Sequence, residues 1–218
     1  MRIYTDEFML RHDTGAGHVE RSARLERLHF SLAEQPIPGV SMHKPRLATP
    51  EELKLVHDAD YVSRILALDG QALALDADTN LSLDSVQAAR LAAGAGLCAV
   101  EDLVAGLCPS AFALVRPPGH HAEHDRAMGF CVFNNVAIAA AHAVQSLGVK
   151  RVLIIDWDVH HGNGTAHIFE SRSDVLVFGT HEHPLWPGGG AKSETGTGPG
   201  DGFTINVPLP AGCGDTEY

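Results

Sequence analysis

The stretch RVLIIDWDVHHG, residues 151–162, decides how this chain folds and where its chemistry lies. The residues before Asp156 form a continuous apolar run, which is typical of a strand buried on both faces of a parallel sheet. Alternate residues of an extended segment point the same way, so Asp156, Asp158 and His160 are expected on one side of the chain. A carboxylate and an imidazole two residues apart can both reach one divalent cation. Such oxygen and nitrogen ligands with open positions suit catalytic zinc or ferrous iron.

An alternative for this stretch is a buried aspartate that binds loop amides at the end of a strand. The Asp-x-Asp pair alone would favour that interpretation. The added segment 160–164, with the sequence HHGNG, favours the metal site instead.

Helical and strand patterns alternate along the rest of the chain. Strands are expected over 111–115, 151–155, 175–178 and 203–207. Helices are expected over 19–33, 84–105 and 133–147, with a further one beginning at Thr49 and Pro50. Asp84 is expected to cap the second of these helices, and Gly106 to end it. The alternation indicates an α/β fold with a parallel sheet, and the glycine-rich stretch 188–202 is expected to be a loop.

Polar clusters follow three of the expected strands, at 116–121, 156–161 and 181–183. In α/β sheets, ligands bind at the carboxyl ends of the strands, so these clusters are expected to meet at one edge. His120 and His121 follow a rigid Pro-Pro-Gly turn and could serve as a general base and its electrostatic partner. In isolation they would be taken as loop histidines satisfied by their neighbours. Residues 123–125 are interpreted as a solvated rim.

The composition excludes several classes of function. The formal net charge of -11 argues against direct binding to nucleic acid, which depends on neutralising phosphates. The 4 cysteines have no CxxC spacing and are expected to be reduced thiols, and no apolar run reaches membrane-spanning length. We therefore expect a cytoplasmic protein without membrane contact. The motifs of serine hydrolases (Gly-x-Ser-x-Gly), Walker NTPases and HExxH proteases are absent.

Three blocks of the chain resemble a known family: 116–122 (RPPGHHA), 129–135 (GFCVFNN) and 156–165 (DWDVHHGNGT). They are similar to signature motifs of the histone deacetylase superfamily, in particular its class II-like bacterial amidohydrolases. Segments 12–20 and 180–188 also resemble that superfamily. The resemblance implies a three-layer arginase/deacetylase-type fold with a central, mainly parallel sheet. The Asp-x-His order is that of the mononuclear deacetylases, whereas arginases arrange Asp-x-His-x-Asp around two metals.

The resemblance implies that Asp158 and His160 are ligands of a zinc ion. It also implies a structural K+ or Na+ ion held by backbone carbonyls, namely those of Asp156, Asp158, His160, Gly179 and Thr180. The family usually has a serine where Gly179 stands, so that side-chain ligand is missing here.

The resemblance also implies a catalytic role for each remaining polar residue. His121 would be the general base toward water, and His120 its electrostatic partner. Asp156 would support His120, and Asn163 would support His121. The implied reaction is zinc-dependent hydrolysis of an acyl amide, in which the metal polarises the carbonyl and activates the attacking water.

The implied substrate is an acylated lysine or polyamine in a narrow tunnel. The Gly129 carbonyl would bind the substrate amide, and Phe130 and Trp186 would form the walls, with core packing as the alternative for both aromatic residues. Asp78 would be the rim carboxylate that binds substrate, although Asp76 competes for that role.

One departure from the family lies at the end of the chain. The third zinc ligand, an aspartate, and the tyrosine that donates to the oxyanion are expected beyond Tyr218, since neither Asp201 nor Asp215 stands at the matching place. We therefore expect one catalytic domain over 1–218, truncated at its C-terminus, with weakened zinc binding and an exposed apolar sheet edge. Two hypotheses follow. The chain is a portion of an amidohydrolase, or it is a non-catalytic module that binds an acyl-amine or a protein, or forms a homo-oligomer through the open edge.

Overall fold

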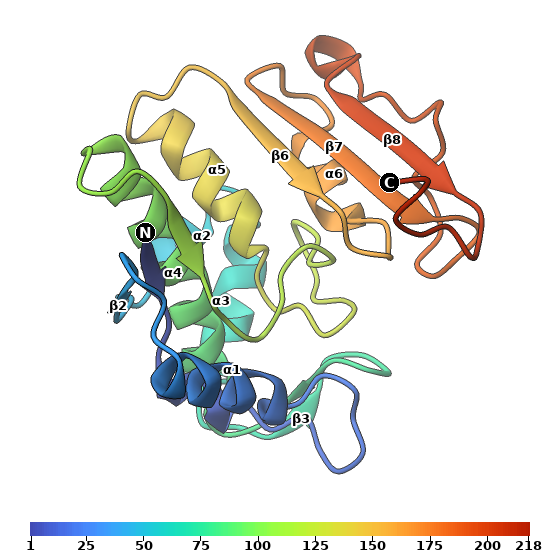
Figure 1. The fold of residues 1–218 in the computed structure, drawn as a ribbon. Helices are drawn as coiled ribbons and strands as arrows, with labels where there is room; N and C mark the ends of the chain where they lie inside the picture. The colour runs from blue at the N-terminus through green and yellow to red at the C-terminus, as the bar shows by residue number, and fades with distance from the viewer.

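The computed structural model describes residues 1–218 as two three-stranded parallel sheets joined by helices (Figure 1). The strand orders are β2-β1-β5 and β6-β7-β8, and neighbouring strands run parallel in both. The expected α/β class with parallel strands is confirmed. The strands lie in two separate sheets, however, and not in one continuous central sheet.

The first sheet is formed by the N-terminal half of the chain. It contains β1 (Arg2–Tyr4), β2 (Ser41–His43) and β5 (Ala111–Ala113). The 3-10 helix η1 (Glu7–Arg11) and α1 (Ser22–Glu34) come between β1 and β2. The long helix α4 (Ser85–Val104) packs against β1 and β5. Because β1 and β5 run parallel, the loop after β5 leaves the sheet at the end where β1 also ends.

The second sheet follows in the C-terminal half. It contains β6 (Val152–Asp156), β7 (Val175–Glu182) and β8 (Thr204–Leu209). Helix α5 (Asn135–Gln145) packs on β6 and also against α4, and α6 (Asn163–Phe169) packs on β7. The α4–α5 contact therefore joins the two halves (Figure 1). The expected loop over 188–202 is present and contains only the short 3-10 helix η2 (Gly198–Gly200).

The main apolar core lies beside α4, where α3 (Ala59–Ala67) and the segment before α5 pack together. The short helix α2 (Pro50–Leu53) and the hairpin of β3 (Leu73–Ala74) and β4 (Asn80–Leu81) complete this half. Thr49 caps α2 with a reciprocal bond to Glu52, as its position before Pro50 predicts. None of the helices combines the length and apolar character that crossing a bilayer requires.

Three details differ from the expectations. Asp84 stands at the start of α4 but makes no capping bond, because its backbone (φ -101, ψ 0) is not in the extended conformation from which a capping side chain reaches the helix amides. Strand β7 continues to Glu182, beyond the expected end at residue 178. Finally, β6 is not buried on both faces: Ile154 packs against α5, whereas Leu153 and Ile155, which point to the opposite face, are 58% and 52% exposed. Strand β6 is also an edge strand that pairs only with β7.

Candidate active site

The loops that follow β5 and β6 meet although these strands belong to different sheets. His120 and His121 come from the first loop, and their rings lie 3.9 Å apart, centre to centre. Asp156 ends β6, and its Oδ2 lies 2.9 Å from His120 Nδ1. Two of the three expected strand ends therefore converge on one site. In the third cluster, His181 is buried against His161, with ring centres 4.8 Å apart, and no contact of its side chain with His120 or His121 is observed.

His120 and Asp156 form a close, largely buried pair. Burial alone would lower the pKa of His120, but the hydrogen bond and the charge of Asp156 outweigh it, so the pKa lies above its usual value. The loop after β6 runs so close to this pair that position 162 has no room for a side chain, because a Cβ added at Gly162 would lie 2.3 Å from Asp156 Oδ2. The arrangement favours a charged imidazole at His120.

His121 has a different environment. Its Nδ1 lies 2.8 Å from the carbonyl oxygen Oδ1 of Asn163, the first residue of α6. Burial, and then the charge of His120, lower the pKa of His121 to about 4. Two adjacent imidazoles thus have pKa values shifted in opposite directions, an arrangement that separates a proton acceptor from a charged partner.

Asp158 and His160 lie side by side and partly exposed on the loop after β6. Asp158 Oδ1 is 3.2 Å from His160 Nδ1. Two ligands of one tetrahedral zinc ion lie about 3.3 Å apart, so this pair fits a divalent metal. The alternative role of the aspartates also occurs, because Asp156 Oδ1 accepts the amide of Asp158 and Asp158 Oδ1 accepts the amide of His160.

Trp186 and Gly129 border the histidines. The Trp186 ring stands edge-on to His121 at 4.7 Å and to His160 at 5.8 Å, and it is partly exposed. Gly129 lies against both Trp186 and His121, and its φ of 56° is in the left-handed region. Trp186 therefore lies on the surface beside these histidines and is not a core residue.

Phe130 and Asp78 form a neighbouring edge. Phe130 also has a positive φ (69°), and its amide donates to Thr79 Oγ1 at 3.1 Å. Its ring packs edge-on against His18 at 4.9 Å. Asp76 is occupied by the turn, because it accepts the amides of Asp78 and Thr79. The Asp78 carboxylate accepts no backbone amide and has only a long bond of 3.4 Å from Thr79 Oγ1, so it is the more available of the two carboxylates.

Of the residues expected around a monovalent cation, Asp156 ends β6 and Gly179 and Thr180 lie on β7, whereas Asp158 and His160 are in the loop after β6. Asp156 is opposite Gly179 in the strand register. The Thr180 hydroxyl is buried without a hydrogen-bond partner. An added Cβ at Gly179 would meet nothing closer than 3.9 Å, so space for a small group remains there.

Two polar residues behind the site were not expected. Glu123 is not part of a solvated rim: it is 2% exposed and bonds to Asn163 and His167. Its neighbours His124 and Asp125 are more exposed, which is why its local sequence looks like a rim. Arg116 is fully buried, with a two-pronged bond to Glu20 at 2.9 and 2.7 Å. Nothing in the spacing of either pair along the sequence signals these contacts.

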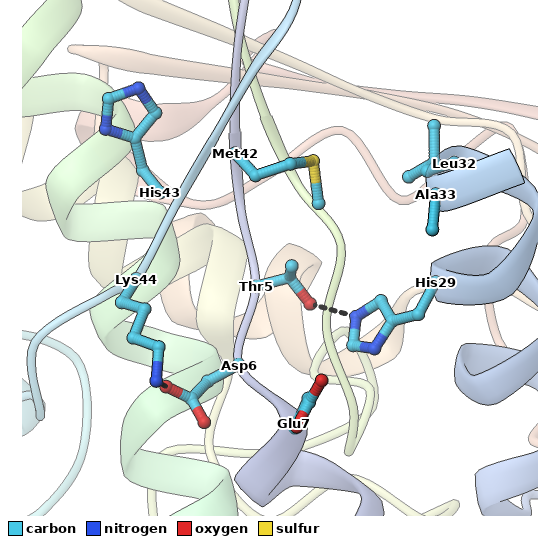
Figure 2. A pocket seen from close by; sticks show the side chains of 9 residues that line it. All are labelled: Thr5, Asp6, Glu7, His29, Leu32, Ala33, Met42, His43 and Lys44. Atoms are coloured by element: carbon cyan, nitrogen blue, oxygen red, sulfur yellow. Dashed lines mark hydrogen bonds and ion pairs between the residues drawn. The ribbon is translucent and has the colours of Figure 1, made fainter. Parts of the chain in front are cut away.

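Two other features lie apart from these residues. Glu52, Glu101 and His142 bring ligand-type atoms within 4.8 Å of one another, but Arg46 already forms ion pairs of 2.6 Å with both glutamates. A hollow of about 450 Å³ lies among α1, β1 and β2 (Figure 2). It contains none of the site residues expected from the sequence.

Comparison with known proteins agrees with this geometry. Residues 18–218 match the family described as the histone deacetylase domain. A probable deacetylase of Archaeoglobus fulgidus is 38% identical over 99% of this chain and 60% of its own length. A polyamine deacetylase of Homo sapiens is 43% identical over 90% of this chain and 31% of its own length.

The crystal structure of the HDA15 HD domain superposes with a TM-score of 0.91 and 41% identity, over 97% of this chain and 62% of that one. The chain thus spans three fifths or less of the two curated relatives. Sequence motifs, fold and comparisons agree, and the chain belongs to the histone deacetylase family.

Proposed function

We propose that this chain carries the catalytic histidines and two metal ligands of an amidohydrolase that removes acetyl or related acyl groups from an acylated lysine or polyamine-type amine. The observation that carries the proposal is the pair of adjacent histidines with pKa values shifted in opposite directions, beside Asp158 and His160. The names of the matched relatives, which include a polyamine deacetylase, support the class of substrate.

Asp158 and His160 would hold the metal, with zinc favoured and ferrous iron as the alternative. When bound, the ion supplies Lewis-acid chemistry, polarising the acyl carbonyl and activating water. The carbonyls of Asp156, Gly179 and their neighbours would hold K+ or Na+.

The histidines would move the proton. His121, neutral at physiological pH, accepts the proton of the attacking water at Nε2, while Asn163 holds its Nδ1. His120, charged through its contact with Asp156, stabilises negative charge that develops on the substrate. His121 then returns its proton to the leaving amine.

The remaining residues would select the substrate. Trp186 and Phe130 form apolar walls for an extended alkyl chain, and the Gly129 carbonyl accepts a hydrogen bond from the N–H of the substrate amide. Asp78 at the edge binds a backbone amide or an ammonium group.

The test is hydrolysis of a panel of acyl-lysine peptides and acetylpolyamines, with the zinc content measured on the same sample. Turnover that requires stoichiometric metal and is lost in His121→Gln supports the proposal. Tight binding of an acylated amine without turnover would instead support a non-catalytic binding module.

A further inference from the structure

Behind His121 lies a buried carboxylate that the proposed reaction does not use. Glu123 Oε1 accepts a hydrogen bond of 2.5 Å from Asn163 Nδ2. Asn163 in turn presents its Oδ1 to His121 Nδ1 at 2.8 Å. One line of hydrogen bonds therefore joins Glu123 to the imidazole through the amide.

The direction of these bonds follows from what each group can donate. A carboxylate only accepts, so Asn163 must turn its NH2 toward Glu123 and its carbonyl toward His121. An amide carbonyl also only accepts, so His121 must carry its proton on Nδ1. Nε2 then keeps the lone pair, which is the form that a general base requires.

Glu123 is held as an ionised, fixed acceptor. Burial raises the pKa of its carboxyl, but the bonds from His167 and Asn163 outweigh burial, and the pKa lies below its usual value. His167 Nδ1 lies 2.9 and 3.0 Å from the two carboxylate oxygens. The backbone is fixed as well, because the His57 ring binds the Glu123 carbonyl at 2.8 Å and the Glu123 amide donates to Arg126 at 3.0 Å.

We propose that Glu123 is a positioning residue that sets the tautomer of His121 by fixing the orientation of the Asn163 amide. His120 shows the contrasting arrangement, since it contacts the carboxylate of Asp156 directly and its charged form is favoured. Placing a neutral amide between Glu123 and His121 orients the ring while keeping the full negative charge one residue away. The catalytic consequence rests on the proposed function, but the tautomer itself does not.

The test is ¹⁵N NMR of the histidine-labelled 218-residue chain at neutral pH, without metal or substrate. The His121 signals are identified by their loss in His121→Gln. In the wild type we expect a proton on Nδ1 and none on Nε2. In Glu123→Gln the new amide can donate or accept, so Asn163 is free to turn over and a population with the proton on Nε2 should appear.

The matched control is Asp125→Asn, which removes a nearby carboxylate that makes no bond to Asn163, and it should leave the tautomer unchanged. A folded Glu123→Gln variant with the wild-type tautomer would overturn the proposal. If that variant does not fold, the tautomer of His121 is measured in Asn163→Ala instead, because this change removes the acceptor at His121 Nδ1 and should also allow the proton to move to Nε2. An unchanged tautomer there overturns the proposal equally.

The double variant Glu123→Gln, Asn163→Asp tests whether the orientation of the side chain at position 163 sets the tautomer, or whether position 123 simply needs a carboxylate for the protein to be stable. Here the glutamine can donate to the aspartate, and the aspartate again only accepts from His121. Because a carboxylate in direct contact also favours the charged ring, as at His120, this spectrum is recorded at a pH high enough for the His121 ring to be neutral. There we expect a single tautomer with the proton on Nδ1 to return, and a persistent mixture would contradict the proposal. Where turnover is measurable, Glu123→Gln should lower kcat by about 10–100-fold with little change in KM. The NMR result stands even if the chain hydrolyses no amide, so the two proposals can fail separately.

Discussion

At the scale of single residues, the space between His121 and Trp186 admits only a glycine. A Cβ at Gly129 would lie 2.5 Å from Trp186 Cη2 and 2.7 Å from His121 Cδ2. We expect Gly129→Ala to displace one or both rings. A misplacement of about 1 Å costs on the order of 100-fold in rate, so kcat/KM for an acetyl-lysine amide should fall by about that factor.

The control for this change is Gly70→Ala. Gly70 also has a positive φ (78°), but an added Cβ there meets nothing within 4 Å. Both variants carry the same kind of backbone strain, so Gly70→Ala measures the loss of melting temperature that the positive φ alone causes, and any additional loss in Gly129→Ala comes from the clash with the rings. Equal activity in the two variants would show that the close packing around Gly129 is not important.

How much of the site could be predicted depends on where the partners lie in the sequence. Some partners are adjacent or two residues apart, namely His120 with His121 and Asp158 with His160. Their pattern can be recognised from the sequence alone. The bond from Glu123 to Asn163 spans 40 residues and depends on where the loop after β5 meets α6. A charged residue that is followed by other polar residues looks like part of the surface, and only the tertiary contact shows that it is buried.

At the scale of elements, the long periodic helices α1, α4 and α5 were predictable because each carries its own apolar pattern and ending. The short strands β1 and β2 were not, because 3 residues each carry too little pattern, and their pairing joins segments about 40 residues apart. The separation of the two sheets was also unpredictable, since strand patterns indicate neither order nor neighbours.

A pH prediction belongs to the contact between the loop before α3 and the start of α5. His57 donates from Nδ1 to the Glu123 carbonyl and accepts the Asn134 amide at Nε2. Burial lowers the pKa of His57 to about 4. The unfolded chain therefore takes up this proton first, and the free energy of unfolding should fall as the pH drops from about 7 to 4.

Urea unfolding at several pH values measures this effect. His57→Gln should make the dependence on pH shallower by at most about 1.4 kcal/mol per pH unit, which corresponds to one proton. A wild-type slope in His57→Gln would mean that this histidine does not titrate on unfolding.

A second prediction concerns the attachment of the N-terminal loop to the end of β5. Arg116 binds Glu20 and also donates to the carbonyls of Met9 and His12. Arg116→Met leaves the buried carboxylate of Glu20 without its partner, so we expect a loss of about 3–5 kcal/mol in the free energy of unfolding. Lys44→Met removes an ion pair to Asp6 whose lysine side chain is 84% exposed, and it should cost less than about 1 kcal/mol. Similar losses in both variants would contradict this account.

At the scale of the whole molecule, the candidate site lies where the two separate sheets meet. His120 follows β5 of the first sheet and Asp156 ends β6 of the second, and their contact is made where the two loops meet. The α4–α5 packing fixes the distance between the sheets. A change in how the two halves pack should therefore alter the contact between His120 and Asp156 before it alters the pairing of strands within either sheet.

The exposed face of β6 leads to the last prediction. An edge strand with unpaired backbone groups and apolar side chains favours pairing with another chain. Because Leu153 and Ile155 are more than half exposed on β6, we expect the chain to self-associate as its concentration rises. Sedimentation velocity should show this, and Leu153→Lys should shift the distribution toward the monomer. Ile37→Lys, at a residue that is 50% exposed between α1 and β2, should leave association unchanged. A monomeric wild type at every concentration would show that this edge does not mediate association.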